Sequence, residues 1–166
     1  MKNLRNLLLL ALVFGVTMQC AKKGIGRDLN EIRTLVDSVW NKGDVSLLDK
    51  YIAPDVVRRA PGQPDFKGIE SYRTAVQNFR TAFPDLRMEF VDTVIEGESS
   101  ASHWVMSGTH KGVLRMDTGA EIPPTGKRMA MQGVTFIKWK NGMIVEEFAV
   151  TDTLGAFQQL GLIPSP

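Results

Sequence analysis

Asp152 is the residue whose type and position best suit acid or base chemistry in this chain. It ends a strand predicted over 143–152, and strict alternation places Phe148 and Val150 on the same face. A carboxylate on that apolar face would be poorly solvated, which suits a general acid or base near neutral pH. The alternative is structural, because aspartate at the end of a strand often caps the next helix, here one beginning near Leu154.

Two basic positions are the next candidates. His103 lies in a strand predicted over 102–108, where it could shuttle a proton, and a half-exposed strand histidine is the alternative. Arg59 follows Arg58 at the end of a short strand predicted over 55–60, and alternation allows only one of the two to face inward. An inward-facing Arg59 would bind a carboxylate or an enolate-like anion. The alternative is that both arginines are solvated at the end of the strand.

Aromatic side chains complete the candidate site. We expect Trp104, Phe79 and Phe148 to contact an apolar ligand, although aromatic residues at regular spacing more often belong to a core. No metal site is expected, because the chain has 2 histidines and no clustered acidic spacing. No phosphate-binding glycine loop or nucleophile elbow is present in the sequence, and no cofactor is expected.

The first residues are typical of an export signal. Two positive charges precede an apolar run over 7–16, which is too short to span a bilayer. The single cysteine, Cys20, stands where a bacterial lipoprotein would be cleaved and acylated. We therefore predict a signal peptide over 1–20, a tether over 21–27 and a domain over 28–163. The protein would be exported and held at the bacterial envelope by a lipid anchor only, or otherwise be periplasmic or secreted.

Charge excludes one class of partner. Of the 20 basic residues, Lys2 and Arg5 precede Cys20, so 18 basic and 18 acidic residues remain in the mature chain. A neutral domain has no net basic face for a nucleic acid, so we expect a small apolar ligand or substrate instead.

The elements that must position these residues follow from periodicity. Apolar side chains recur at helical spacing over 29–39 and 69–83, and Asp28 with Glu31 resembles a capping box. After Pro84 the period changes to that of strands, with Asn141-Gly142 a strong hairpin signal and Gly133 a predicted bulge or bend. This order predicts an α+β fold, in which helices cover one side of a curved antiparallel sheet and enclose a small-molecule pocket.

Several short motifs occur in an order that resembles SnoaL-like polyketide and ester cyclases, within the nuclear-transport-factor-2-like superfamily. They are VWNKGD (39–44), APDVV (53–57), AFPDL (82–86), GTHKG (108–112), IPPTGK (122–127), NGMIVE (141–146), DTLG (152–155) and QQLG (158–161). The resemblance covers about residues 30–162. It implies a cone-shaped, curved antiparallel sheet packed on three helices, a cystatin-like α+β roll.

The resemblance also implies a chemistry. Cyclases of this family close a ring in an aldol-like step, using a carboxylate near the end of the last strand and no metal or organic cofactor. That carboxylate corresponds to Asp152, which His103 could reach. Arg59 stands where many relatives have a histidine, so the cyclase mechanism does not transfer directly.

Three functions remain open at this point. The first is a cofactor-independent cyclase acting on a small apolar carbonyl or polyketide-like compound. The second is a non-catalytic, envelope-anchored module that binds a small ligand. The third is epoxide hydrolysis, for which related enzymes use a carboxylate pair, but Val105 stands where one of these acids would be. By analogy with the fold, we also expect a homodimer through the open sheet face, with Ile137 and Trp139 in the contact.

Overall fold

The computed structural model describes residues 28–116 and 118–165. The predicted signal peptide (1–20), the acylation of Cys20 and the tether (21–27) lie outside these residues. Within the described part of the chain, no helix is both long enough and apolar enough to cross a membrane.

Helical segments form one layer of the domain and include its first and last elements. Asp28 caps the first of them, since its Oδ1 accepts a hydrogen bond from the Glu31 backbone N–H at 2.9 Å, as the capping pattern predicts. The helical segments are α1 (Leu29–Leu35), the π-helical η1 (Val36–Asn41), the 3₁₀ turn η2 (Val45–Leu47), α2 (Leu48–Tyr51), α3 (Ile69–Ala82) and α4 (Thr153–Leu160).

A six-stranded curved sheet forms the second layer, with strand order β2-β1-β8-β7-β4-β3. Its strands are β1 (Ile52–Arg59), β2 (Phe66–Lys67), β3 (Arg87–Glu96), β4 (Ser99–Thr109), β7 (Arg128–Lys140) and β8 (Met143–Thr151). A small separate ribbon is formed by β5 (Leu114–Arg115) and β6 (Glu121–Ile122). The α+β fold is confirmed, with one correction: β1 pairs with β8 in parallel, so the sheet is mixed rather than antiparallel throughout.

One bulge in β8 decides which side chains face inward. Lys138 pairs with Glu146 and Trp139 with Ile144, which leaves one extra residue, Val145, on β8. Beyond a bulge, alternation is displaced by one residue, so every later side chain points to the other face. Glu147 is consequently buried, whereas strict alternation from Ile144 would have placed Glu146 inside.

Two glycine predictions have different outcomes. Asn141 and Gly142 have φ values of 51° and 75°, so the predicted tight turn between β7 and β8 is confirmed. Gly133, in contrast, lies in a regular ladder opposite Trp104, and no bulge occurs there. A Cβ at Gly133 would overlap the Trp104 indole and the Val150 carbonyl, so glycine is needed for space rather than for a bend.

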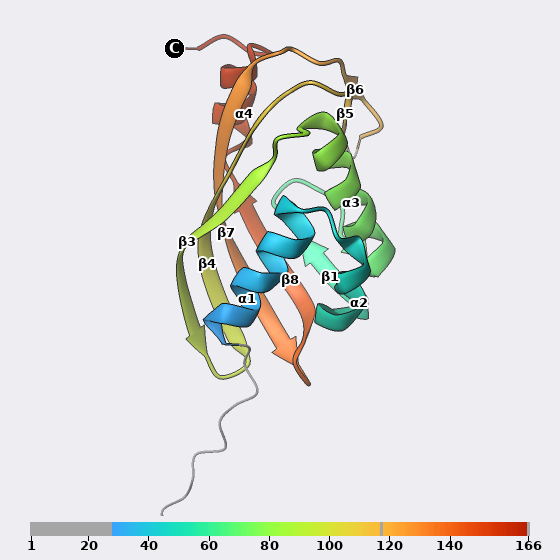
Figure 1. Cartoon of the computed structure of the whole chain (residues 1–166), viewed down its shortest axis with the longest axis vertical. Coiled ribbons are helices and arrows are strands. Elements are labelled where there is room, and N and C mark those ends of the chain that lie inside the picture. Colours follow the sequence, from blue (N-terminus) through green and yellow to red (C-terminus); the bar gives the residue numbers. More distant parts are fainter. Residues whose placement is uncertain (1–27, 117, 166) are drawn as a thin grey trace, which may run out of the picture.

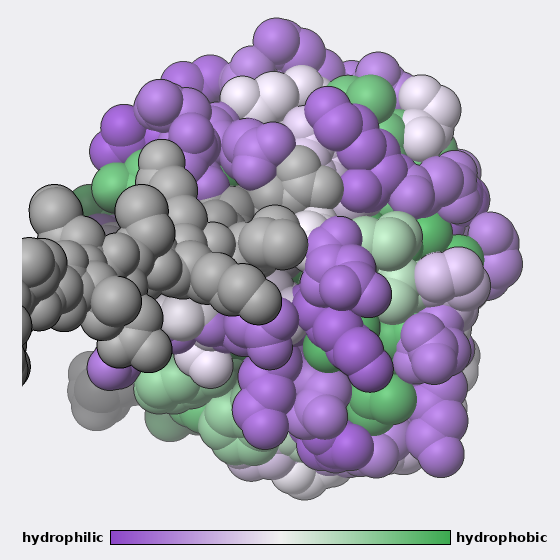
Figure 2. Space-filling view, turned by 90° about the horizontal axis from the view of Figure 1, so that it is seen from below, coloured by the Kyte–Doolittle hydropathy of each residue, from purple (hydrophilic) through white to green (hydrophobic). Residues whose placement is uncertain are grey.

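The helices cover one face of the sheet, and the core lies between the two layers (Figure 1). α1, η1, α2 and α3 lie across the inner face, and α4 packs against β7 at the end of the molecule near the C-terminus (Figure 1). Viewed from the opposite end, the described surface is mainly hydrophilic, with hydrophobic side chains in several small groups between the hydrophilic ones (Figure 2).

Candidate functional site

A cavity of about 190 Å³ lies between the inner face of the sheet and the helices η1 and α3. Most of its lining is apolar, and its charged side chains are Arg58, Arg115 and Glu147. Glu147 is the one carboxylate that lines it among the described residues. An apolar cavity with few polar groups is the usual form of a small-molecule site.

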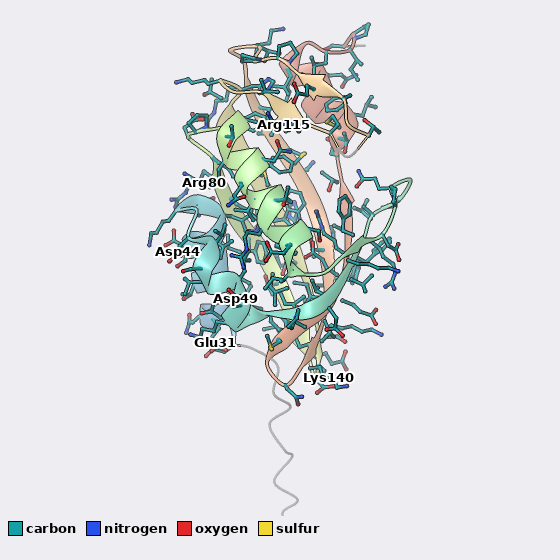
Figure 3. The ribbon with its side chains drawn as sticks, turned by 90° about the vertical axis from the view of Figure 1, so that its right-hand side faces the viewer. Glu31, Asp44, Asp49, Arg80, Arg115 and Lys140 are labelled. Carbon is teal, nitrogen blue, oxygen red and sulfur yellow. The ribbon has the colours of Figure 1, made fainter. Side chains whose placement is uncertain are left out.

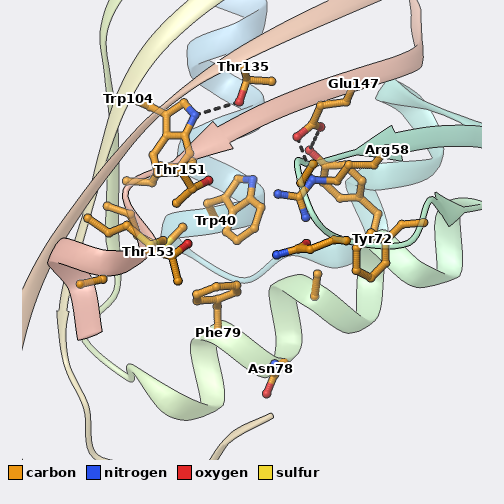
Figure 4. A pocket seen from close by; sticks show the side chains of 18 of the residues that line it. Trp40, Arg58, Tyr72, Asn78, Phe79, Trp104, Thr135, Glu147, Thr151 and Thr153 are labelled. Carbon is orange, nitrogen blue, oxygen red and sulfur yellow. Dashed lines mark hydrogen bonds and ion pairs between the residues drawn. The ribbon is translucent and has the colours of Figure 1, made fainter. Parts of the chain in front are cut away.

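The polar cluster of the cavity joins Arg58, Tyr72 and Glu147 (Figure 4). Arg58 Nε donates a hydrogen bond to Glu147 Oε1 at 3.0 Å, and the Tyr72 hydroxyl donates to Glu147 Oε2 at 2.7 Å. The parallel register of β1 and β8 places Arg58 directly beside Glu147, and α3 supplies Tyr72 from the facing layer. Both oxygens of the carboxylate are therefore held by donors from two different layers.

Burial sets the protonation state of Tyr72 in this cluster. The Glu147 side chain is 5% exposed and Arg58 is 26% exposed, so the pair is largely removed from water. Burial, and then the negative charge of Glu147, raise the pKa of Tyr72 well above its ordinary value of 10. The phenol consequently keeps its proton near neutral pH and acts as a donor toward the carboxylate.

Aromatic side chains form a fixed wall next to this cluster. The Trp40 ring meets those of Tyr72 and Phe79 edge to face, at centroid distances of 6.4 and 6.2 Å. Arg80 Nη1 donates to the backbone carbonyl of Trp40 at 2.9 Å and so ties η1 to α3. On the sheet side, Trp104 Nε1 donates to the buried Thr135 hydroxyl at 2.8 Å (Figure 4).

The β5–β6 ribbon borders the entrance of the cavity. A surface hollow shares Phe66, Ala75, Asn78, Arg115 and Met116 with the cavity lining, so the two spaces are adjacent. Asn78 Nδ2 donates to the Arg115 carbonyl at 2.6 Å, and the Arg115 N–H donates to Asn78 Oδ1 at 3.0 Å. Arg115 lies at the end of the molecule opposite Lys140 and the β7–β8 turn (Figure 3).

The sequence profile of SnoaL-like polyketide cyclases matches residues 30–160, which is most of this chain. The chain belongs to the SnoaL-like polyketide cyclase family. None of the curated proteins compared with it matches in sequence.

Solved structures agree with this family assignment. TsrD from Streptomyces laurentii is 25% identical with a TM-score of 0.69, over 83% of this chain and 100% of TsrD. IdmH, a candidate polyketide cyclase from Streptomyces antibioticus, is 27% identical with a TM-score of 0.65, over 80% of this chain and 97% of IdmH. A SnoaL-like polyketide cyclase from Agrobacterium tumefaciens shares the fold at 24% identity and a TM-score of 0.64, over 82% of this chain and 100% of its own.

The two predicted catalytic residues of this SnoaL-like domain lie outside the cavity. Asp152 is exposed and caps α4, with its Oδ1 accepting from the Gly155 N–H at 2.8 Å, so the expectation that it is a poorly solvated carboxylate is wrong. His103 lies on the outer face of the sheet, with Nε2 3.4 Å from Gln132 Oε1. Their catalytic roles stay predictions to which this geometry gives no support.

The predicted ligand-binding residues divide evenly. Trp104 and Phe79 line the cavity, whereas Phe148 faces the outside of the sheet because of the bulge in β8. Arg59 also faces outward, where it pairs with Asp65 at 3.4 Å and with Glu146 at 3.3 Å. Placing Arg59 in the cavity was wrong, since Arg58 is the inward member of the pair.

Glu147, Arg58 and Tyr72 were not predicted as a group from the sequence. The glutamates at 146 and 147 were a usable signal that one acid of this strand faces inward, and a charged side chain is rarely buried without a partner. Nothing in the sequence indicated the bulge that turns Glu147 inward. Within the described residues, no group of three or more His, Cys, Asp or Glu side chains is placed to hold a metal ion.

His110 closes the loop that carries the β5–β6 ribbon, and it is fully buried. Its ring stacks on Phe83 at 5.1 Å, its Nδ1 lies 3.3 Å from the Thr125 N–H, and its Nε2 has no hydrogen-bond partner. Its backbone pairs with Lys127 and Gly126 at 2.9 Å each, which joins the two ends of the loop. This environment does not stabilise a charged ring, so burial lowers the pKa of His110 below 6.5.

We expect acid to destabilise the domain through His110. Because its pKa is lower in the folded state, the unfolded chain takes up the proton first, and stability is lost as the pH falls below about 6.5, by at most about 1.4 kcal/mol per pH unit. Urea unfolding of the wild type and His110→Gln between pH 7.5 and 5.5 measures this, and the variant should show a shallower dependence. His103→Gln, at the half-buried second histidine on the outer face of the sheet, is the control. Equal slopes for the wild type and His110→Gln would contradict the assignment.

Proposed function

We propose that this domain is a cofactor-independent cyclase-type enzyme, of lyase or isomerase type, acting on a small apolar carbonyl or polyketide-like compound. The observation that supports it is the cluster of Glu147, Arg58 and Tyr72 in an otherwise apolar cavity. A carbonyl compound bound there meets one carboxylate, one cation and one neutral hydroxyl. These are the groups that removal of a proton next to a carbonyl requires.

Each residue has a separate role in the proposed reaction. Glu147 accepts the proton from the carbon next to the carbonyl, which leaves an enolate whose charge is on oxygen. Arg58 and the protonated Tyr72 hydroxyl stabilise that charge as donors. The enolate carbon then attacks a second carbonyl of the same molecule, and Glu147 returns its proton to the new alkoxide. The reaction is balanced without an oxidant, a reductant or a cofactor.

A turnover assay on β-dicarbonyl and polyketide-like compounds tests this proposal. The wild type and Glu147→Gln are compared, with folding checked by circular dichroism. Loss of turnover in the folded variant supports the proposal, and turnover equal to that of the wild type overturns it.

A second function is favoured by one feature of the same cluster. Both oxygens of Glu147 already accept hydrogen bonds, so the cavity also suits a module that binds an apolar ligand without reaction. If the domain only binds a ligand, the wild type shows no turnover, and Glu147→Gln binds the ligand as the wild type does. Epoxide hydrolysis has less support, because Glu147 is the one carboxylate lining the cavity in the described chain.

The open face of the sheet is our proposed contact between two copies of the chain. Its exposed apolar side chains lie side by side, with Phe136 opposite Phe148 and Val134 opposite Val150. The prediction that Ile137 and Trp139 lie in this contact is wrong, since both are buried on the inner face.

Light scattering after size exclusion is expected to give twice the monomer mass for the wild type. Phe136→Asp should give the monomer mass, because it places a charge in the centre of the contact. Leu154→Asp, at an exposed apolar residue on α4, should leave the dimer intact. A monomeric wild type would refute the proposed contact.

A further inference from the structure

Methionine side chains are concentrated in the cavity. The chain has 8 methionines, and those that line the cavity are Met88, Met106, Met116, Met129 and Met131. Met143, the remaining described methionine, is half-buried in β8 and lies outside the lining. The methionines are therefore concentrated in the part of the hydrophobic core that borders the cavity.

Three of these side chains form one continuous row. Met88 on β3 pairs with Met106 on β4, and Met106 pairs in turn with Met131 on β7. All three are buried on the inner face of the sheet. Adjacent strands are about 4.8 Å apart, so the three side chains are direct neighbours. We call this set the methionine row.

The methionine row differs physically from the aromatic wall. Trp104 is fixed by its hydrogen bond to Thr135 and by the space over Gly133, and Trp40 is tied through its backbone to Arg80. Methionine is unbranched and polarisable, so it changes rotamer and fills irregular gaps at little energetic cost. Leucine would bury a similar apolar volume with a more defined shape.

The cavity is small for a ligand-binding site. At about 190 Å³ it is smaller than the roughly 300 Å³ at which ligand pockets usually begin. A ligand of several rings that lies wholly within this cavity therefore requires one wall to move, and the aromatic wall is held in place by the contacts described above.

We infer that the methionine row is the adjustable wall that sets the range of ligands the cavity accepts. Rotamer changes at Met88, Met106 and Met131 enlarge the space next to the fixed aromatic wall, so the site takes flat apolar carbonyl compounds of differing ring number. This inference rests on the proposed binding of a carbonyl ligand in the cavity. It concerns selectivity by size and is independent of the proton transfer by Glu147.

Calorimetric titration with aryl methyl ketones of one, two and three fused rings tests the inference. The probes are acetophenone, 2-acetylnaphthalene and 2-acetylanthracene. The proteins are the wild type, the triple variant Met88→Leu/Met106→Leu/Met131→Leu, and the control Met143→Leu. Met106→Leu alone, at the centre of the row, replaces the triple variant if that variant does not fold.

We expect the wild type and Met143→Leu to bind all three ketones. The triple variant should keep its affinity for acetophenone and lose about tenfold or more for the three-ring ketone, which corresponds to about 1.4 kcal/mol. Equal affinities in the triple variant and the wild type overturn the inference, as does an equal loss for all three ketones. Failure of the wild type to bind the three-ring ketone also overturns it. Binding is measured without turnover, so these outcomes are separate from the Glu147→Gln test.

Discussion

Glu147→Gln is expected to lower the turnover of a carbonyl substrate by about 10²- to 10⁴-fold, the usual contribution of a positioned general base. Glutamine keeps the shape of the side chain and can still accept hydrogen bonds through its amide oxygen. It cannot accept a proton from carbon near neutral pH. Since Glu147 is the one carboxylate in the described lining, no neighbouring acid is placed to replace it.

The preceding residue provides a matched control. Glu146 is one position away in β8 but points outward, where it pairs with Arg59 at 3.3 Å on the exposed face. Glu146→Gln removes the same charge from the same strand without changing the cavity, so its turnover should stay close to that of the wild type. Equal losses in the two variants would indicate a general effect of charge and would contradict a catalytic role for Glu147.

Local signals in the sequence were sufficient for the elements of this fold. The Asp28 cap, the Asn141-Gly142 turn and the helical spacing over 69–83 each depend on a few neighbouring residues. Such features are determined by backbone geometry within one turn or hairpin. The parallel pairing of β1 and β8 depends on where distant strands meet, and no local pattern indicated it.

The candidate site depends on a feature that leaves no clear trace in the sequence. A regular strand from Ile144 places Glu146, Phe148 and Asp152 inside, and this predicted set of inward residues is wrong. The extra residue at Val145 reverses the alternation, which brings Glu147 inside and turns Phe148 outward. Residues 146 and 147 are both glutamate, so either register places one acid on each face of the sheet. The residue types at these positions therefore did not show which glutamate faces inward.

The sequence likewise did not show which of Arg58 and Arg59 faces inward. Alternation required that one of Arg58 and Arg59 face inward, and the structure agrees with that requirement. The choice between them follows from the register of β1 against β8, which shifts between Ile52 and Val57. Position in a family pattern therefore identified the correct pair but selected the wrong member.

Arg58→Met is expected to reduce the free energy of unfolding by about 3 kcal/mol, the lower end of the range for breaking a buried ion pair. Glu147 would keep its burial and its Tyr72 contact but lose the cation at 3.0 Å. The lower end applies because Arg58 is 26% exposed, so water partly compensates for the lost partner. Urea unfolding monitored by circular dichroism measures the change.

Arg59→Met is the matched control for that prediction, since it removes the neighbouring arginine from the exposed face. Its partners, Asp65 and Glu146, are 44% and 47% exposed, and ion pairs of this kind contribute less than about 1 kcal/mol. The double variant Arg58→Met/Glu147→Gln should recover much of the stability lost in Arg58→Met, because a neutral amide needs no cation. If Arg58→Met and Arg59→Met cost the same, or if the double variant is no more stable than Arg58→Met, the buried charge of Glu147 is not what Arg58 compensates.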